Sequence, residues 1–158
     1  MIEFCGKIEL FFYELVQRAQ LHTKTTLSPN TEFSVVFLLS DIHHNRIDEM
    51  SGPLFFKLEN AIGSSKDEQF KKFKNLGDSS LAMLGFFSEN IQQKALSQDY
   101  FRSMGCMGYS RASEVAKKHF VDRDFADFYE EMADCFVDAE VVIRKVKGLV
   151  ALRHIELR

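Results

Sequence analysis

Apolar residues recur three and four positions apart along almost the whole of this chain. That spacing places them on one face of an α-helix, whereas a half-buried strand alternates apolar and polar residues. Alternating runs bounded by turn residues are missing until the last ten residues. The chain has two prolines, and each follows a residue that commonly caps a helix, in Ser28-Pro29 and Gly52-Pro53. The pattern therefore predicts an all-α fold.

The 158 residues suffice for one domain with a real core, and no linker divides them. We expect residues 1–158 to form a single bundle of about five main helices plus one short helix. The main helices are predicted over 2–22, 29–44, 65–87, 98–120 and 122–147, and the short helix over 53–62.

Local signals set the expected helix ends. Ser65 and Glu68 have the spacing of a capping box at the start of a helix, and Gly148 is expected to end the last long helix. A turn is expected within 88–97, and the tail at 149–158 fits either a short helix or an extended edge. The helix over 29–44 is expected to be the most buried, because its middle is apolar on every side.

Charge and hydropathy exclude several classes of partner. The net charge is −3, and the lysines of the segment 66–74 alternate with acidic and apolar residues. Nucleic-acid binding usually needs a concentrated basic face, so no nucleic-acid partner is expected. The longest apolar run, Phe33 to Leu39, is far shorter than the roughly 20 residues that span a bilayer. Acidic residues interrupt the first apolar segment, unlike in a secretory signal, so we expect a cytoplasmic protein without membrane insertion.

Two glycines, Gly105 and Gly108, lie inside the helix predicted over 98–120. A glycine inside a helix costs about 1 kcal/mol relative to alanine, so these positions need a packing or functional reason. Both fall near one face, where small residues let another helix approach closely. The alternative is a pocket for a small apolar ligand, roofed by Tyr100 or Tyr109. These four residues form the candidate binding site.

Apparent catalytic motifs fail on context. Gly77-Asp78-Ser79 resembles the start of one family of serine esterases, and Asp41 with His44 has the aspartate-to-histidine spacing of those enzymes. Yet the order is reversed, and Ser79 lies in a predicted helix where such enzymes place it after a strand. No catalytic residue is therefore assigned.

Metal chemistry is considered at one helix edge, where Asp41, His44 and Asp48 lie together. Polar residues at a helix end more often cap the helix or meet solvent. The glutamate-x-x-histidine pairs of di-metal bundles do not occur in the sequence. We therefore expect neither a metal nor another cofactor.

An acidic side runs along the helix predicted over 122–147. Its acidic residues, led by Asp127, Glu131, Asp134 and Asp138, recur almost every turn. Such a row is first explained as a solvated face. As a functional surface, it would meet a protein partner or a second copy of the chain.

A combination of short motifs carries a family resemblance. Leu76-Gly77-Asp78, Gly85-Phe86-Phe87, Asp99-Tyr100-Phe101, Met104-Gly105 and Gly108-Tyr109 resemble a group of uncharacterised bacterial all-helical proteins. The resemblance implies a bacterial, cytoplasmic, helical protein, and it brings no activity, cofactor or site residue.

The sequence supports two hypotheses about function. The leading hypothesis is a non-enzymatic helical interaction module, regulatory or scaffolding, that binds a protein partner or self-associates. The alternative is a small-molecule-binding protein, or an enzyme, with a pocket between helices near Tyr100, Gly105, Gly108 and Tyr109.

Overall fold

The computed structural model describes residues 6–44, 54–92, 97–119 and 123–156. Within these ranges the regular structure is helical, with no strand, so the predicted all-α class is confirmed. The helices are α1 (Lys7–Thr23), α2 (Pro29–His43), α3 (Leu54–Ile62), α4 (Lys66–Gly85), α5 (Ser88–Gln92), α6 (Gln98–His119), α7 (Arg123–Asp134) and α8 (Phe136–Glu156).

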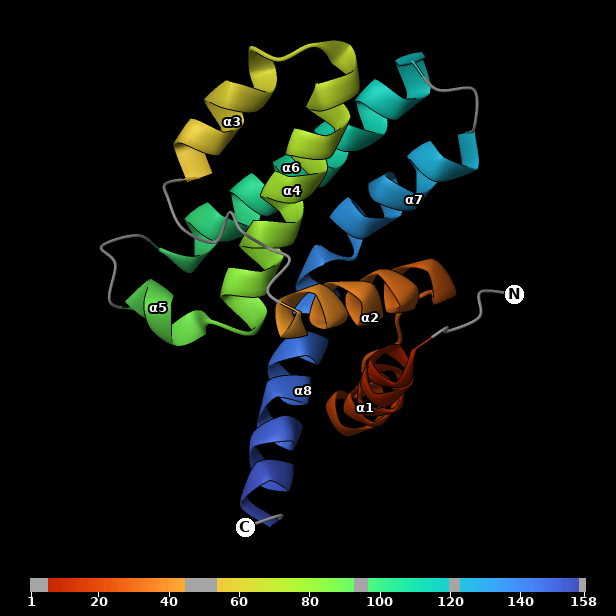
Figure 1. Ribbon diagram of the computed structural model, residues 1–158, viewed down its shortest axis with the longest axis vertical. Helices are drawn as coiled ribbons and strands as arrows, with labels where there is room; N and C mark the ends of the chain where they lie inside the picture. Colours follow the sequence, from red (N-terminus) through yellow and green to blue (C-terminus); the bar gives the residue numbers. More distant parts are fainter. Residues whose placement is uncertain (1–5, 45–53, 93–96, 120–122, 157–158) are drawn as a thin grey trace.

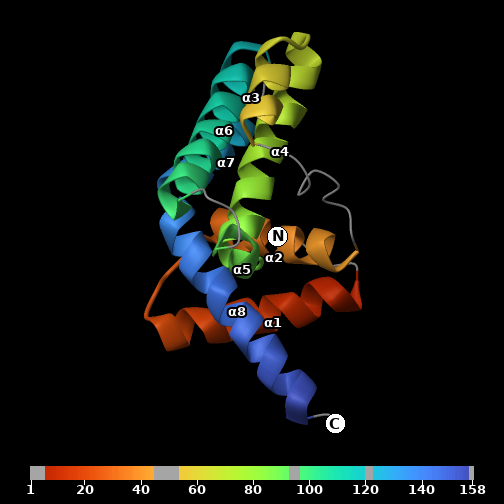
Figure 2. The ribbon, with the colours of Figure 1, turned by 90° about the vertical axis from the view of Figure 1, so that its left-hand side faces the viewer.

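The long helices form two groups that meet in the middle of the molecule (Figure 1). In the upper group, α4 and α6 share the most extensive interface, with α3 packed on α4 and α7 packed on α6. α1 and α2 lie against each other and run across the direction of α4, as the turned view shows (Figure 2). α8 crosses α1, so the last helix packs on the first.

Two predicted helix starts have different outcomes. The Ser28 hydroxyl accepts a hydrogen bond from the Thr31 N–H at 3.3 Å, and Pro29 occupies the first turn of α2, as predicted. α4 begins directly after Ser65, but this side chain makes no capping hydrogen bond, so the predicted capping box is wrong. The Gly52-Pro53 start lies outside the described residues.

The segment predicted as one helix over 122–147 is two helices, α7 and α8, which meet at Cys135. No proline or glycine marks this junction in the sequence. Phe136, the first residue of α8, is 1% exposed, and its ring lies against Gly105, so the start of α8 packs on α6. α8 continues through Gly148 to Glu156, so the predicted stop at Gly148 is wrong and the described tail is helical. Part of the expected turn at 88–97 is the short helix α5.

The most buried helix is α4, and the prediction that the helix over 29–44 would be is wrong. Every residue from Leu76 to Gly85 is buried except Asp78. The serines of this stretch are small, and their hydroxyl groups form hydrogen bonds. The Ser80 hydroxyl, for example, donates to the Leu76 carbonyl at 2.8 Å. In α2, by contrast, Phe37 is 43% exposed.

A buried ion-pair cluster joins α6 to α8. Glu140 is 2% exposed, and the Arg102 guanidinium donates to both of its carboxylate oxygens at 2.8 Å. Arg144 lies 3.0 Å from the same carboxylate and donates from Nε to the Leu84 carbonyl of α4 at 3.1 Å. The cluster therefore ties α4, α6 and α8 together at one point.

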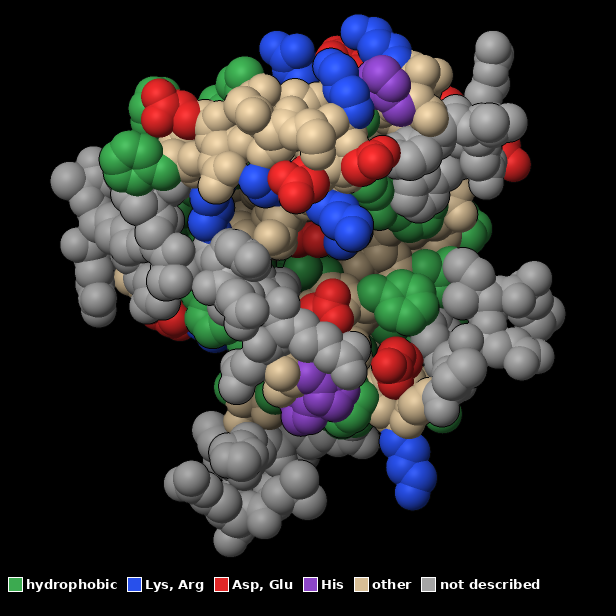
Figure 3. All heavy atoms as spheres, turned by 45° about the horizontal axis from the view of Figure 1, so that its top comes forward, with side chains coloured by type: hydrophobic (Ala, Val, Ile, Leu, Met, Phe, Trp, Pro, Cys, Tyr) green, Lys and Arg blue, Asp and Glu red, His purple; other side chains and the backbone are tan. Residues whose placement is uncertain are grey.

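The surface of the upper group carries a concentration of basic side chains. Lys, Arg and His residues gather along the upper edge of the view in Figure 3. The start of α4 and the end of α6 supply Lys66, Lys117, Lys118 and His119, all of them exposed. Among the described helices, none has both the length and the apolar character needed to cross a membrane.

Candidate functional site

The site is positioned by the crossing of α4 and α6. A Cβ atom added at Gly108 would lie 2.6 Å from the backbone nitrogen of Gly77 and 2.7 Å from the Phe73 carbonyl oxygen. Real Cβ atoms do not approach backbone so closely, so the two helices can meet here only through glycine. Gly108 is therefore a packing position at the closest point of the crossing.

The four candidate binding residues do not share a hollow. The space beside Gly105 is filled by the Phe136 ring, which a Cβ at Gly105 would approach to 2.4 Å. Tyr100 is half-buried in the first turn of α6, where its ring meets Phe101 edge to face. Of these four residues, Tyr109 lines the cavity described below.

Tyr109 is held over Gly77 and bonded to its neighbour on α4. A Cβ at Gly77 would lie 2.6 Å from the Tyr109 ring, so the missing side chain leaves room for that ring. Tyr109 is 1% exposed, and its hydroxyl donates a hydrogen bond to Oδ1 of Asp78 at 2.6 Å. Burial is the main cause that raises the pKa of Tyr109 well above its ordinary value, and the Asp78 charge adds to it.

The second oxygen of Asp78 pairs with a lysine one helical turn earlier. Lys74 Nζ lies 2.6 Å from Asp78 Oδ2. Burial by itself lowers the pKa of Lys74, but the charge and hydrogen bond of Asp78, with a further contribution from Asp41 on α2, outweigh it and raise that pKa. Lys74 is thus fixed as an ammonium ion beside two carboxylates.

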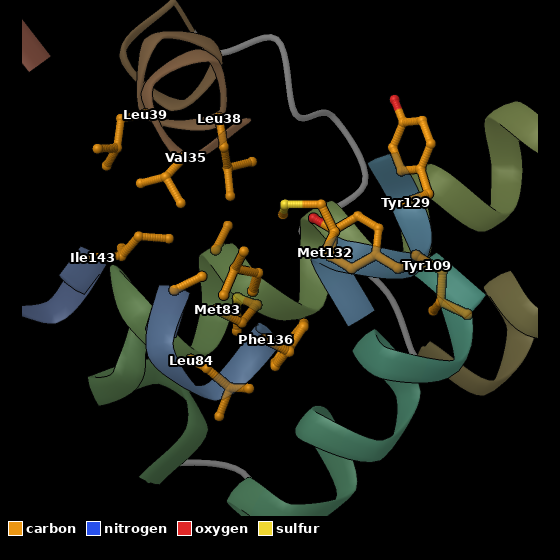
Figure 4. Packing of buried hydrophobic residues seen from close by; sticks show 14 of the residues in the cluster. Val35, Leu38, Leu39, Met83, Leu84, Tyr109, Tyr129, Met132, Phe136 and Ile143 are labelled. Carbon is orange, nitrogen blue, oxygen red and sulfur yellow. The ribbon is translucent and has the colours of Figure 1, made fainter. Parts of the chain in front are cut away.

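A cavity of about 250 Å³ lies beside this network, between α2, α4, α6 and α7. The Tyr109 and Tyr129 rings stack with their centroids 6.2 Å apart, and Tyr129 points its hydroxyl away from the other labelled core residues (Figure 4). The lining is aromatic and apolar with a charged edge, and consists of Ser34, Phe37, Leu38, Asp41, Lys74, Asp78, Tyr109, Phe128, Tyr129 and Met132.

The two tyrosines and the lysine that line the cavity hold their protons in neutral solution. Burial raises the pKa of Tyr129 to about 12, with Lys74 opposing the shift and Asp78 adding to it. With Tyr109 and Lys74 also shifted upward, none of the three is a base or nucleophile near pH 7. Two carboxylates, Asp41 and Asp78, lie at the edge of the cavity together with Lys74. The arrangement suits binding of a cation more than proton transfer.

Three comparisons with known proteins found no match. No family model, curated protein or solved structure matches this chain. The function of the cavity is therefore inferred from the residues that line it.

The rejected catalytic motif occupies a buried part of α4. Ser79 is fully buried, and its hydroxyl accepts a hydrogen bond from Lys57 Nζ at 3.5 Å. Of the metal candidates, Asp41 lines the cavity and His44 is exposed, while Asp48 lies outside the described residues. In the ranges that the structure covers, no three His, Cys, Asp or Glu side chains are grouped to hold a metal ion.

The acidic row is divided between two helices. Asp127 and Asp134 are exposed on α7, and Asp138 is exposed in the first turn of α8, beyond the junction at Cys135. Glu131 is partly buried and accepts a hydrogen bond from the Asn30 side chain of α2 at 3.3 Å. The row is thus an interrupted surface, and its role as an interaction face stays a prediction.

The sequence reasoning missed the charged edge of the cavity. Lys74 and Asp78 stand four residues apart, a spacing that pairs side chains along a helix and was available in the sequence. Their link to Tyr109 and Asp41 depends on how α2, α4 and α6 cross, which no local pattern encodes.

Proposed function

We propose that this protein is a non-enzymatic binding protein whose cavity takes a small organic cation. One observation supports this proposal above the others. The cavity brings two carboxylates, Asp41 and Asp78, beside a lining of aromatic rings.

Both features favour the same class of ligand. A cation over an aromatic face gains about 0.5–2 kcal/mol, depending on how far it is desolvated. A carboxylate adds a charge-assisted hydrogen bond if the cation is an amine. The volume of about 250 Å³ equals about eight water molecules at roughly 30 Å³ each, which limits the ligand to a small amine or ammonium ion.

Calorimetric titration with three probes of one shape tests the proposal. The probes are 2-phenylethylammonium, neutral 2-phenylethanol and anionic phenylacetate. We expect measurable binding of the cation and at least about tenfold weaker binding of the other two, which is a difference of about 1.4 kcal/mol. Equal binding of phenylacetate, or no binding of the cation, would contradict the proposal.

A matched pair of variants locates the binding. Asp41→Asn removes one carboxylate of the cavity and is expected to weaken binding of the cation about tenfold. Asp127→Asn makes the same change at an exposed position of α7 that does not line the cavity, and should leave the affinity unchanged. Equal affinities in the two variants would place the ligand elsewhere.

A second candidate function is the helical interaction module, with a protein partner or a second copy. The observation in its favour is the exposed apolar surface of α3. Phe55 is 53% exposed, Phe56 63% and Ile62 61%. Large apolar side chains gathered in one exposed place are typical of an interaction surface.

A further inference from the structure

A groove of about 470 Å³ lies between α3, α4 and α6, and it shares no lining residue with the aromatic cavity. Along α6 it reaches from Met107 to His119. The twelve steps between these two residues, at a rise of about 1.5 Å each, give it a length of about 18 Å. The groove is therefore elongated, and it is larger than the aromatic cavity.

Apolar side chains from three helices form the floor of the groove. Leu58 and Ile62 come from α3, Phe73 from α4, and Met107 and Val115 from α6. Ile62 is 61% exposed and Met107 is 38% exposed. Phe55, 53% exposed, precedes Ile62 by two helical turns and extends the apolar face of α3.

Basic side chains border this floor. Lys66, Arg111, Lys118 and His119 line the groove with a single acidic residue, Glu114, on a protein whose net charge is −3. Arg111 lies 3.5 Å from Glu114, with both side chains exposed.

Lys66 and Lys118 form no ion pair with the described residues, whereas lysines near them in the sequence do. Lys72 pairs with Glu68, and Lys117 pairs with Glu130. Across the described residues, no ion pair forms at Lys66 or Lys118. The groove thus presents positive charge that the described part of the chain does not neutralise.

We propose that this groove docks an acidic amphipathic helix of a partner protein. The apolar stripe of that helix packs on Ile62, Phe73 and Met107, and its carboxylates face Lys66, Arg111 and Lys118. Grooves of this kind commonly take helices whose apolar residues recur at helical spacing. The length of the groove matches about three turns of helix.

The distribution of charge favours a helix over an anionic lipid. Arg111 and Lys118 stand seven residues apart on α6, which is about 10 Å along the axis. A fatty acid carries one carboxylate and would use one end of this row. A helix with glutamates two turns apart matches both positions.

Fluorescence anisotropy with labelled peptides tests the proposal. The first peptide is a 16-residue helix, a length of about four to five turns, with leucines on one face and glutamates on the other. A second peptide has lysines in place of the glutamates, and a third has serines in place of the leucines. We expect the first to bind, and the other two to bind at least about tenfold more weakly. Salt should weaken the first complex, because exposed charges are screened.

Variants of the protein show whether the groove is the docking site. Lys66→Glu with Lys118→Glu, and separately Ile62→Ser, are each expected to weaken binding of the acidic peptide at least about tenfold. Lys71→Glu and Val137→Ser are the controls, since both residues are exposed and neither lines the groove. The controls should bind the peptide as the unchanged protein does, and circular dichroism should show that all variants are folded.

Three results would overturn the proposal. The first is equal affinity for the three peptides or for groove and control variants. The second is binding to phosphatidylglycerol vesicles, lost in the groove variants, without binding of the acidic peptide. The third is self-association in sedimentation experiments that Lys66→Glu with Lys118→Glu abolishes, because a second copy would then be the occupant.

Discussion

Arg102 on α6 and Glu140 on α8 form a two-bond ion pair, with Nε–Oε1 and Nη2–Oε2 both 2.8 Å. Glu140→Gln should lower the free energy of unfolding by about 1–3 kcal/mol, because two partly exposed arginines lose their charge-assisted hydrogen bonds to a buried carboxylate. Urea unfolding measures this loss. Glu130→Gln removes an exposed pair with Lys117 and should change stability little. Similar midpoints for both variants would show that the buried pair does not secure α8.

The helix crossing at Gly108 predicts opposite effects for one substitution at two glycines. Gly108→Ala places a methyl against the backbone of α4 and should destabilise the protein by about 1–3 kcal/mol. Gly148→Ala adds the same methyl inside α8, where nothing lies within 4 Å, and should stabilise it by up to about 1 kcal/mol. Thermal unfolding distinguishes them. A neutral Gly108→Ala would mean that α4 and α6 can separate without cost.

The raised pKa of Tyr129 predicts sensitivity to alkali. An unfolded tyrosine ionises near pH 10, whereas Tyr129 in the folded protein does so at about 12. Neutral Tyr129 therefore contributes to the free energy of unfolding fully below about pH 10. This contribution, up to roughly 3 kcal/mol, is lost as the pH rises through 12. Tyr129→Phe should reduce that loss. Urea midpoints at about pH 8 and pH 11 for both proteins measure the difference, and parallel losses would exclude Tyr129 as the cause.

The acidic row predicts a change in binding without a change in folding. Replacing Asp127, Glu131 and Asp134 by lysine should alter recovery of a protein partner in a pull-down. The melting temperature should change little, because two of the three residues are exposed and the Asn30–Glu131 hydrogen bond is a weak, exposed one. Unchanged recovery of the partner would count against this surface.

A local rule predicted the start of α2 correctly, whereas the local rules at Ser65 and Gly148 failed. The cap at Ser28 and the proline after it set the start of α2 in the sequence and in the structure. The division at Cys135 was not predictable, since no proline or glycine marks it in the sequence and the residue that follows, Phe136, packs beside Gly105, some thirty residues earlier in the chain. Long-range packing overrides a continuous helical pattern in such places.

The candidate site was predicted in part. Helical spacing placed Gly105, Gly108 and Tyr109 in the predicted binding site, and the structure shows that Tyr109 lines a cavity. The cavity itself lies on the side of α4 that carries Lys74 and Asp78. Its position depends on four helices at once, and sequence periodicity describes one helix at a time.

The contact of α1 with α8 has a consequence for folding. These helices lie near opposite ends of the described chain, and contacts so distant in sequence form slowly, because closing a long loop costs entropy before the contact stabilises it. During synthesis, α1 is made first, and the face of α1 that contacts α8 stays uncovered until α8 has been made. A nascent chain stalled before Phe136 should therefore bind more of a hydrophobic dye than the finished protein does, and equal dye binding would show that α2 alone shields α1.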